Sequence, residues 1–376
     1  MQIDFHYYAT FCAAILAGFS RDDALATAYC DQFVDECSVT LLKKIKGPTA
    51  AATTQLQSEL LNARTDRAGL QDITRIWSSF HFLPYDLYAD AGRGGKSYKN
   101  KYRLICGPNG TLVADTVRLA KNRGPQAAGV AMHVLSDTWA HRYFAGTPSL
   151  AINNTDFHFF ELTGDPDEPE RMIRFNHNPL GADDPTKGVY TNSLFGTSEK
   201  SIMNLGHGRA GHFPDYSYAR YRYLPAWGNY RETVKDNPSD YYSAFCQMVF
   251  ALKYLRGAVP EFNVDTYDET AVAPHEKKIR RILIERRTDS SEDWRALGED
   301  LSGEEVEEFD VLKYQSEYRD ADDKPDSFLG RFISAALAQK SMVTESICRS
   351  GNPLAGHSAD PKNKKTRRRE KGGAEE

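Results

Sequence analysis

The stretch from Ala131 to His141 restricts the fold of this chain more than any other part of it. Its apolar spacing predicts a helix, on which His133, Asp137 and His141 follow one another at intervals of four residues. At 3.6 residues per turn, these side chains drift by only about 80° around the axis and therefore share one face. The two histidines lie about 12 Å apart along the axis, too far for both to hold one ion easily. The pattern favours more than one metal ion with Asp137 as a shared ligand, although such spacing also occurs in ordinary helix-face hydrogen bonds.

The composition of the chain is that of a soluble globular protein. Its 376 residues are 40% hydrophobic and 26% charged, and the net charge of -5 gives no reason to expect bulk nucleic-acid binding. No apolar run approaches the roughly 20 residues that span a bilayer. The apolar segment 11–18 lacks a basic region before it, so we expect no signal peptide and a cytoplasmic protein, with secretion by a signal-less route left open.

The six cysteines are scattered and contain no CxxC pair, which favours buried, reduced thiols over a disulfide framework. The apolar periodicity predicts an all-α protein, a multi-helix bundle with long irregular loops. We expect a metal-binding catalytic domain over residues 1–260, a helical C-terminal extension over 261–346 and a disordered tail over 347–376. The expected helices cover residues 5–18, 21–45, 52–79, 111–122, 126–145, 199–209 and 237–256, with loops over 90–110 and 146–200.

Other histidines and aspartates supply candidate ligands for the same centre. Imidazole suits Zn²⁺, and a carboxylate adds a charge-neutralising oxygen. Each residue also has an ordinary interpretation, such as a surface histidine, a solvated acidic face or a histidine buried in the core. Gly206 and Gly208 flank one of these histidines and permit close backbone approach there. The candidates are His6, Asp35, His81, His207 and Asp215, with Asp4, Asp31 and His212 in reserve.

The motif on the predicted helix resembles a known superfamily. His133 and Asp137, followed by a third histidine, are similar to the central motif of zinc-dependent phospholipase C and the S1/P1 nucleases. The early His6, the helical Asp35, the His81-Phe82 pair and the late His207 and Asp215 extend this resemblance. More narrowly, the phrases DFHYYA at 4–9, QFVD at 32–35 and FPD at 213–215 resemble an uncharacterised bacterial family, a domain of unknown function on a distant branch of that superfamily.

The resemblance implies an all-helical enzyme with a cluster of two or three zinc ions, whose central aspartate bridges two of them. Those enzymes also bind zinc through the amine and carbonyl of an N-terminal Trp. This chain begins with Met1, so we expect that ligand to be missing and Asp4 to substitute through its carboxylate. The final acid of the family pairs with a histidine at short spacing, and here either His207 or His212 could pair with Asp215.

The activity that this resemblance implies is metal-dependent hydrolysis of a phosphoester, of phospholipase C type, with a phospholipid as one candidate substrate. Asp4, Asp31 or Asp35 would be the general base if it is not a ligand, and Asp137 would act as the shared ligand. A nuclease acting on single-stranded nucleic acid is an alternative, as is a non-catalytic helical binding protein stabilised by metal. The aromatic residues from Tyr216 to Trp227 could line a substrate site or pack in a core.

Overall fold

The computed structural model describes residues 1–63, 67–155, 158–178, 180–192, 194, 196, 199 and 202–353. Its α-helices are α1 (Thr10–Leu16), α2 (Arg21–Glu36), α3 (Val39–Lys44), α4 (Gln57–Ala63), α5 (Arg67–Phe80), α6 (Lys96–Tyr102), α7 (Thr111–Ala120), α8 (Gly124–Ala140), α9 (Leu150–Asn153), α10 (Asn237–Leu255), α11 (Glu269–Val272), α12 (Glu276–Ile284), α13 (Ser291–Ser302), α14 (Gln315–Asp320) and α15 (Phe328–Arg349). The strands are β1 (Phe160–Leu162), β2 (Glu170–Met172), β3 (Asn176–His177), β4 (Thr191–Asn192), β5 (Arg220–Tyr223) and β6 (Thr233–Asp236). The first turn is a π-helix, η1 (Asp4–Ala9), and the short 3-10 turns are η2 (Thr49–Ala51), η3 (Ile202–Asn204), η4 (Gly208–Ala210), η5 (Phe213–Asp215), η6 (Ala226–Gly228), η7 (Ala273–His275) and η8 (Lys324–Asp326).

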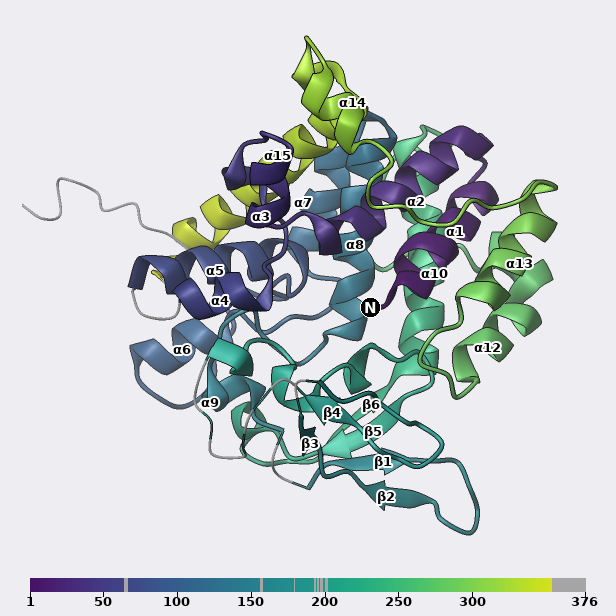
Figure 1. The fold of residues 1–376 in the computed structure, drawn as a ribbon. Helices are drawn as coiled ribbons and strands as arrows, with labels where there is room; N and C mark the ends of the chain where they lie inside the picture. The colour runs from purple at the N-terminus through teal and green to yellow at the C-terminus, as the bar shows by residue number, and fades with distance from the viewer. Residues whose placement is uncertain are drawn as a thin grey trace, which may run out of the picture.

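Helix α8 is the central element of the molecule. It begins at Gly124-Pro125, where the fixed φ of proline suits the first helical turn. All of its residues from Gln126 to Ala140 are buried, as expected for a helix that is apolar on every side. Helices α2, α5, α7, α10 and α15 pack around it (Figure 1). The helix predicted to carry the metal motif is therefore also the centre of the hydrophobic core.

The approach of α2 to α8 is close because α8 presents small residues to it. A Cβ atom on Gly129 would lie 2.3 Å from the carbonyl oxygen of Thr27 and 2.6 Å from Cβ of Cys30. Both distances are shorter than real Cβ contacts, so only glycine permits this spacing. Because Asp31 and Asp35 lie on the same helix just after this contact, the position of Gly129 also sets where their carboxylates meet α8.

A small antiparallel sheet lies at the lower end of the helices in Figure 1. Its strand order is β2-β1-β5-β6, and β6 leads directly into α10. A second apolar cluster packs beneath it and includes Phe159, Phe213, Tyr221 and Tyr223. Phe213 on η5 belongs to this cluster, and the amide of Gly206, just before η4, donates to the carbonyl oxygen of Ala145 beyond the end of α8.

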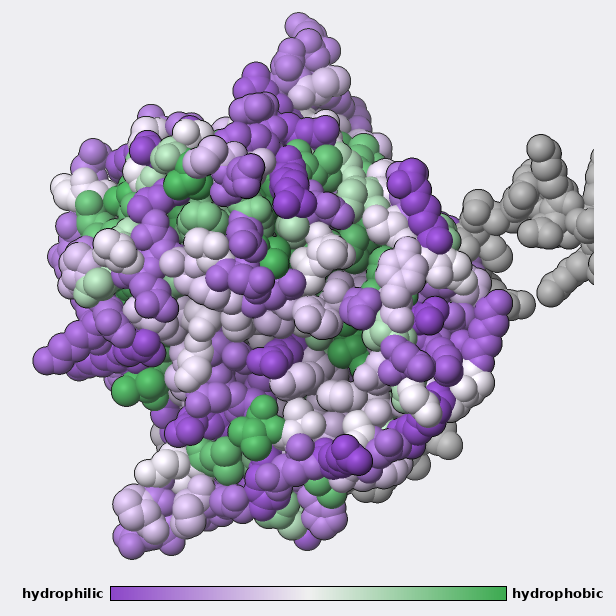
Figure 2. Space-filling view, turned by 180° about the vertical axis from the view of Figure 1, so that it is seen from behind, coloured by the Kyte–Doolittle hydropathy of each residue, from purple (hydrophilic) through white to green (hydrophobic). Residues whose placement is uncertain are grey.

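The helices after residue 260 contribute to the same core as the helices before it. Ile279, Trp294 and Phe332 are buried in one cluster with residues of α1, α2, α8 and α10. The face of the molecule seen from behind is mostly hydrophilic, with hydrophobic residues in scattered patches (Figure 2). Residues 347–349 of the predicted disordered tail belong to α15, and the part of the tail from residue 354 onward lies outside the described residues. None of the described helices is long and apolar enough to cross a bilayer.

The prediction of a mostly helical protein is confirmed, and its details differ in several places. The expected loop over 90–110 contains α6, the expected irregular segment over 146–200 contains α9 and β1 to β4, and the helix expected over 21–45 breaks at Cys37. The helix expected over 199–209 holds only the 3-10 turns η3 and η4 among its described residues, and α4 and α5 stand in place of the single helix expected over 52–79. The motif helix ends at Ala140, so His141 caps its C-terminus instead of continuing it.

Substituting Gly129 with alanine should destabilise the fold by about 1–3 kcal/mol, because α2 would have to move away from α8. Chemical denaturation followed by circular dichroism measures this change. Gly196→Ala is the matched control, since a Cβ there meets nothing within 4 Å, and it should change the unfolding free energy by only a few tenths of a kcal/mol. Equal stability of the two variants would contradict the assigned packing.

Candidate metal centre

Three groups of histidine and aspartate side chains lie around Asp137 on α8. In each group the candidate ligand atoms all lie within 4.8 Å of one another. The side chains come from η1, from α2, from the residue after α5, from α8 with its C-terminal cap, and from the segment around η4 and η5. The groups are His6, Asp31 and His133; Asp35, His81 and His133; and His141, His207 and Asp215.

Asp137 contacts members of all three groups. Its Oδ2 lies 3.2 Å from Nδ1 of His81, 3.2 Å from Nε2 of His133 and 3.5 Å from Nδ1 of His141. Its Oδ1 lies 3.3 Å from Nε2 of His6. The carboxylate is 1% exposed, so these neighbours replace its water. The position expected from the helical spacing, between the two histidines of the motif, is the one that Asp137 occupies.

Backbone carbonyls fix which nitrogen of His81 and His133 carries the proton. Nε2 of His81 donates to the carbonyl oxygen of Thr53 at 3.0 Å, and Nδ1 of His133 donates to the carbonyl oxygen of Asp31 at 2.9 Å. In neutral imidazoles Nδ1 of His81 and Nε2 of His133 then carry lone pairs. These two nitrogens lie 3.2 Å apart. Two facing lone pairs repel, so a proton or a metal ion is needed between them.

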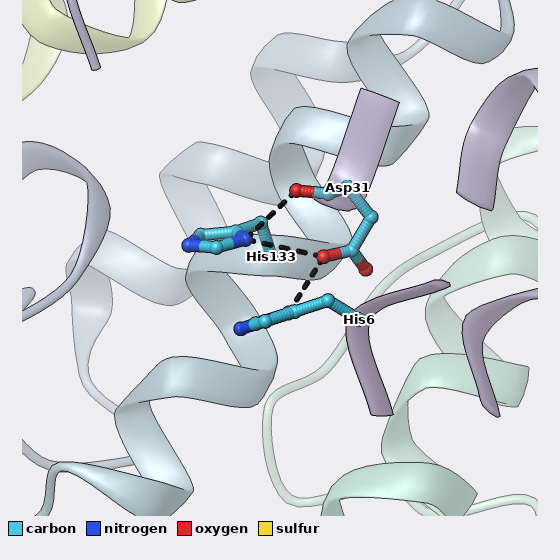
Figure 3. Close-up of side chains that lie close together, drawn as sticks. All are labelled: His6, Asp31 and His133. Atoms are coloured by element: carbon cyan, nitrogen blue, oxygen red, sulfur yellow. Dashed lines mark hydrogen bonds and ion pairs between the residues drawn. The ribbon is translucent and has the colours of Figure 1, made fainter. Parts of the chain in front are cut away.

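Asp31 orients the two histidines of the first group (Figure 3). Its Oδ1 lies 2.7 Å from Nδ1 of His6 and 3.2 Å from Nδ1 of His133, while its Oδ2 accepts a hydrogen bond from Oγ1 of Thr10 at 2.6 Å. The rings of His6 and His133 stack with centroids 4.0 Å apart. A carboxylate behind a histidine in this way is typical of metal centres, where it fixes the ring and strengthens the ligand.

His6 itself is buried without an aligned hydrogen bond. Among the described residues, neither of its ring nitrogens has a hydrogen-bond partner of good geometry, although Nε2 faces Asp137. An unsatisfied buried nitrogen is costly, and a metal ion at Nε2 would satisfy it. The π-helical turn that carries His6 fits this interpretation, because such turns occur frequently at functional sites.

The third group is built in the same manner. Nδ1 of His141 donates to the carbonyl oxygen of His81 at 2.6 Å, and Nδ1 of His207 donates to that of Gly211 at 2.7 Å. The Nε2 atoms of His141 and His207 therefore carry lone pairs, and they lie 2.9 Å and 3.3 Å from Oδ1 of Asp215. These three atoms form a second cluster of candidate metal-ligand atoms, separate from the pair formed by His81 and His133.

The segment that carries His207 reaches the centre because of its glycines. Gly206 has a φ of +55°, and a Cβ there would meet the ring of Phe82 at 2.1 Å. A Cβ on Gly208 would meet the carbonyl oxygen of Met203 at 2.1 Å. The close backbone approach predicted from these glycines is thus confirmed, and the partner of Gly206 is the residue next to His81.

The amino group of Met1 also lies in the centre, which was expected to lack it. Its nitrogen is 2.9 Å from Oδ1 of Asp137, 3.4 Å from Nε2 of His141 and 3.6 Å from Oδ1 of Asp215. Burial lowers the pKa of this amine, but the carboxylates of Asp137 and Asp215 outweigh it and raise the pKa to about 11. Figure 1 shows this end of the chain in the middle of the molecule, between α8 and α10.

Asp4 does not lie among these groups, contrary to its expected role as a substitute ligand or base. Its Oδ1 accepts a hydrogen bond from the amide of Phe5 at 2.8 Å, and its Oδ2 accepts one from the amide of Ser290 at 3.1 Å. Burial raises the pKa of Asp4 to about 6, although the hydrogen bonds from these two amides act to lower it. The carboxylate joins η1 to the start of α13 and leaves the space beside Asp137 to Met1.

The centre attracts positive charge. Burial would raise the pKa of Asp137 and Asp215, but the surrounding histidines and the amine hold both pKa values well below their usual range. Burial would also lower the pKa of His133, yet Asp137 and Asp35 raise it to about 10. His141 differs, because burial dominates and lowers its pKa to about 4. Without a metal, a proton on His133 therefore provides the charge that the carboxylates require.

Asp35 is the most accessible carboxylate of the centre. Its side chain is 31% exposed, whereas those of Asp31, Asp137 and Asp215 are nearly inaccessible. It lies 3.7 Å from Nδ1 of His81, 3.8 Å from Nε2 of His133 and 3.9 Å from Nε2 of His6. At these distances the carboxylate of Asp35 can still change its position. Its exposure places it where solvent reaches the centre.

His207 is the inner partner of Asp215, and His212 is the outer one. The side chain of His212 is 71% exposed and its Nδ1 lies 3.5 Å from Oδ2 of Asp215, with Nε2 of Gln2 at 3.3 Å. The sequence left open which histidine pairs with Asp215. The side chain of His207 is 14% exposed and faces the buried ligand atoms, whereas that of His212 points to solvent.

Sequence reasoning underestimated two members of the centre. Asp31 was kept in reserve, although it lies one helical turn before Asp35 on the same face of α2. The amine of Met1 was expected to be absent. Its only signal was the short distance along the chain from Met1 to His6, which limits how far apart they can lie.

Comparison with known proteins gives one match. No curated protein and no solved structure is significantly similar to this chain. A family model described as a family of unknown function (DUF6765) matches residues 1–347, which include every side chain of the centre. Because this match covers most of the 376 residues, the chain belongs to that family of unknown function.

Proposed function

We propose that this protein is a metal-dependent hydrolase, a phosphoesterase of phospholipase C type that uses a cluster of two or three zinc ions. The observation that carries this proposal is the set of five histidines around two buried carboxylates, Asp137 and Asp215. In four of them a backbone carbonyl fixes the proton on one nitrogen and leaves the other nitrogen as a ligand. In the fifth, His6, no hydrogen bond within the described residues satisfies the ring.

The donor set fits zinc. Zn²⁺ is bound by imidazole nitrogen and carboxylate oxygen, commonly in fourfold coordination. His81 and His133 with Asp137 would hold one ion, with Asp35 beside it at the exposed edge, and His141 and His207 with Asp215 would hold another. None of the described cysteines belongs to these groups, so the ligands are nitrogen and oxygen throughout.

A third ion would have His6 as its main nitrogen ligand. Nε2 of His6 faces Oδ1 of Asp137 at 3.3 Å, and the amine of Met1 contacts the same oxygen at 2.9 Å. Two divalent ions would neutralise the four carboxylates of the centre, and a third would leave net positive charge. That charge supports an anionic substrate such as a phosphodiester, in agreement with the resemblance to phospholipase C.

Bound zinc ions supply two kinds of chemistry, polarisation of a phosphoryl oxygen and a lowered pKa for water. The residues of this chain do the remainder. Asp137 and Asp215 keep the ions in place from within the core, and Asp31 keeps the rings of His6 and His133 in position. Asp35, at the exposed edge, is the carboxylate that can accept a proton from water as substrate is attacked.

Two other functions remain distinguishable by experiment. A nuclease acting on single-stranded nucleic acid would use the same centre. A panel of phospholipid and nucleic-acid phosphodiesters distinguishes it from a phospholipase C. A non-catalytic, metal-stabilised binding protein would show metal and no turnover. The first alternative follows from the same resemblance, and the second from the depth at which most of these ligands are buried.

Metal content should depend on Asp137 more than on any single histidine, because Asp137 contacts all three groups. We expect Asp137→Ala to lose more than one equivalent of zinc. His207→Ala should lose about one equivalent, since it removes a ligand from one group only. Mass spectrometry of metals in the purified proteins measures both.

The matched control is His275→Ala, a half-buried histidine on η7 outside the three groups. It should retain the full metal content. A wild-type protein that binds no zinc after incubation with excess ion, and whose thermal melting is unchanged by a chelator, would refute the metal centre. Loss of equal amounts of zinc from Asp137→Ala and His207→Ala would refute the sharing of Asp137.

Asp35→Asn tests catalysis separately from metal binding. Loss of a general base lowers kcat by about 10²- to 10⁴-fold, while His81, His133 and Asp137 still provide ligands for the same ion. We expect a protein that keeps most of its zinc and loses hydrolysis of a phosphodiester such as bis(p-nitrophenyl) phosphate. If wild type and Asp35→Asn both hold zinc and neither hydrolyses any substrate of the panel, the non-catalytic alternative is favoured.

Metal affinity should depend on pH differently at the group that contains His133 and at the group that contains His141. At neutral pH a metal must displace the proton from His133, whose pKa is raised to about 10, so affinity at that group should rise about tenfold per pH unit up to that value. His141, with a pKa of about 4, is already neutral and releases no proton. Calorimetry in buffers of different ionisation enthalpy counts the protons released. Equal release from wild type and from His133→Ala would contradict this assignment.

A further inference from the structure

A cleft of about 570 Å³ lies beyond the C-terminal end of α8, and none of the residues of the metal centre lines it. Five aromatic side chains from four segments form its walls. They are Tyr85, Tyr102, Trp139, Tyr143 and Trp227. Binding clefts for small molecules commonly have this volume and this aromatic character.

Three of these rings form one continuous wall. Tyr143 stacks on Trp227 with centroids 5.7 Å apart and an interplanar angle of 29°, and Tyr102 meets Trp227 edge-on at 6.4 Å. Tyr85, which also lines the cleft, is 53% exposed. Exposed aromatic surface is unfavourable unless something covers it, so the cleft has a physical reason to bind an organic group.

The floor of the cleft is rigid. Nε1 of Trp139 donates to Oε1 of Gln247 at 2.8 Å, and Nε2 of Gln247 donates to Oδ1 of Asn109 at 2.8 Å. Nδ2 of Asn109 in turn donates to the hydroxyl of Tyr267 at 2.7 Å. Because these polar groups satisfy one another, they hold Trp139 and Asn109 in place before any ligand arrives.

The backbone at Tyr143 is strained in a way that shapes the cleft. Its φ is +82°, a region that non-glycine residues rarely adopt. Hydrogen bonds on both sides keep it there, from the amide of Tyr143 to the carbonyl of Cys106 at 3.0 Å and from the amide of Cys106 to the carbonyl of Phe144 at 2.7 Å. Strain retained in this way is common at binding sites, and here it places an aromatic ring against Trp227.

The uncompensated charge of the cleft is negative. Asp86 and Asp265 line it, and neither carboxylate has an ion-pair partner among the described residues. The one lining cation, Arg142, lies 3.8 Å from Asp240 and packs over the ring of Tyr143 at 4.7 Å. Asp240 also pairs with Nζ of Lys235 at 2.5 Å, so Arg142 keeps part of its charge, and the lining of the cleft sets two carboxylates against one guanidinium.

We propose that this cleft is a second binding site, for a small organic cation of the ammonium type. Aromatic faces carry negative electrostatic potential and attract such cations, most strongly when carboxylates stand nearby. An anion would meet two carboxylates and one guanidinium, a net negative lining, and a neutral apolar group would gain nothing from the carboxylates. The inference is independent of the metal centre, because no ligand of that centre touches the cleft.

The test compares choline with 3,3-dimethylbutan-1-ol, two alcohols of the same shape of which only choline carries a charge. The full-length protein is titrated with each by calorimetry at constant ionic strength, and inorganic phosphate provides an anionic arm. Choline should bind, with an affinity that falls as salt is raised, and the neutral alcohol should bind at least tenfold more weakly. Equal binding of the two alcohols, or binding of phosphate alone, would overturn the proposal.

Variants place the bound cation in the cleft. Trp227→Leu and Asp265→Asn should each weaken choline binding by about three- to tenfold. Tyr143→Gly removes a ring and relieves the positive φ, so it should weaken binding while the melting temperature is kept or raised. Tyr88→Leu is the control, since Tyr88 is 69% exposed and does not line the cleft. Choline binding that none of the first three variants weakens would also overturn the proposal.

Discussion

Asp137 holds a negative charge inside an apolar helix, and the arrangement of the surrounding chain follows from the need to balance it. An ionised carboxylate without partners in such a place would destabilise the fold by several kcal/mol. Its two oxygens instead contact His6, His81, His133 and the amine of Met1. These groups come from distant parts of the sequence, so the fold must bring the beginning of the chain, α5 and α8 to one point. The helices α2 and α10 pack on α8 in positions that permit this.

The part of the centre that lies on one helix could be predicted from sequence, because helical periodicity is a local property. His133, Asp137 and the closeness of His141 follow from it. The tautomers could not be predicted, since they depend on where the carbonyls of Thr53 and Asp31 lie in three dimensions. His81 and His207 were found by chemical type and local context, while their grouping into separate sets became visible only in the structure.

The errors of sequence interpretation have identifiable causes. Asp4 was expected in the centre as a substitute for a missing N-terminal ligand, but the wide π-helical turn directs its carboxylate to the amide of Ser290. The sheet was not expected because its strands are three or four residues long, and β1 and β2 lie in a segment rich in glycine, proline and aspartate. The aromatic residues between 216 and 227 were ambiguous, and the packing interpretation holds for the four buried tyrosines among them. Tyr221 and Tyr223 are packed in the sheet core, whereas Trp227 lines the cleft.

The complete burial of α8 has a consequence for how the protein can change in evolution. Residues on this helix serve the hydrophobic core and the centre together, so a substitution that alters the chemistry of Asp137 or His133 also threatens folding. The ligands outside it are under weaker structural constraint, since Asp35 is partly exposed and His207 lies in a segment without long helices or strands. Descendants with new specificities are therefore expected to differ at these peripheral positions, while the sequence of α8 stays nearly constant.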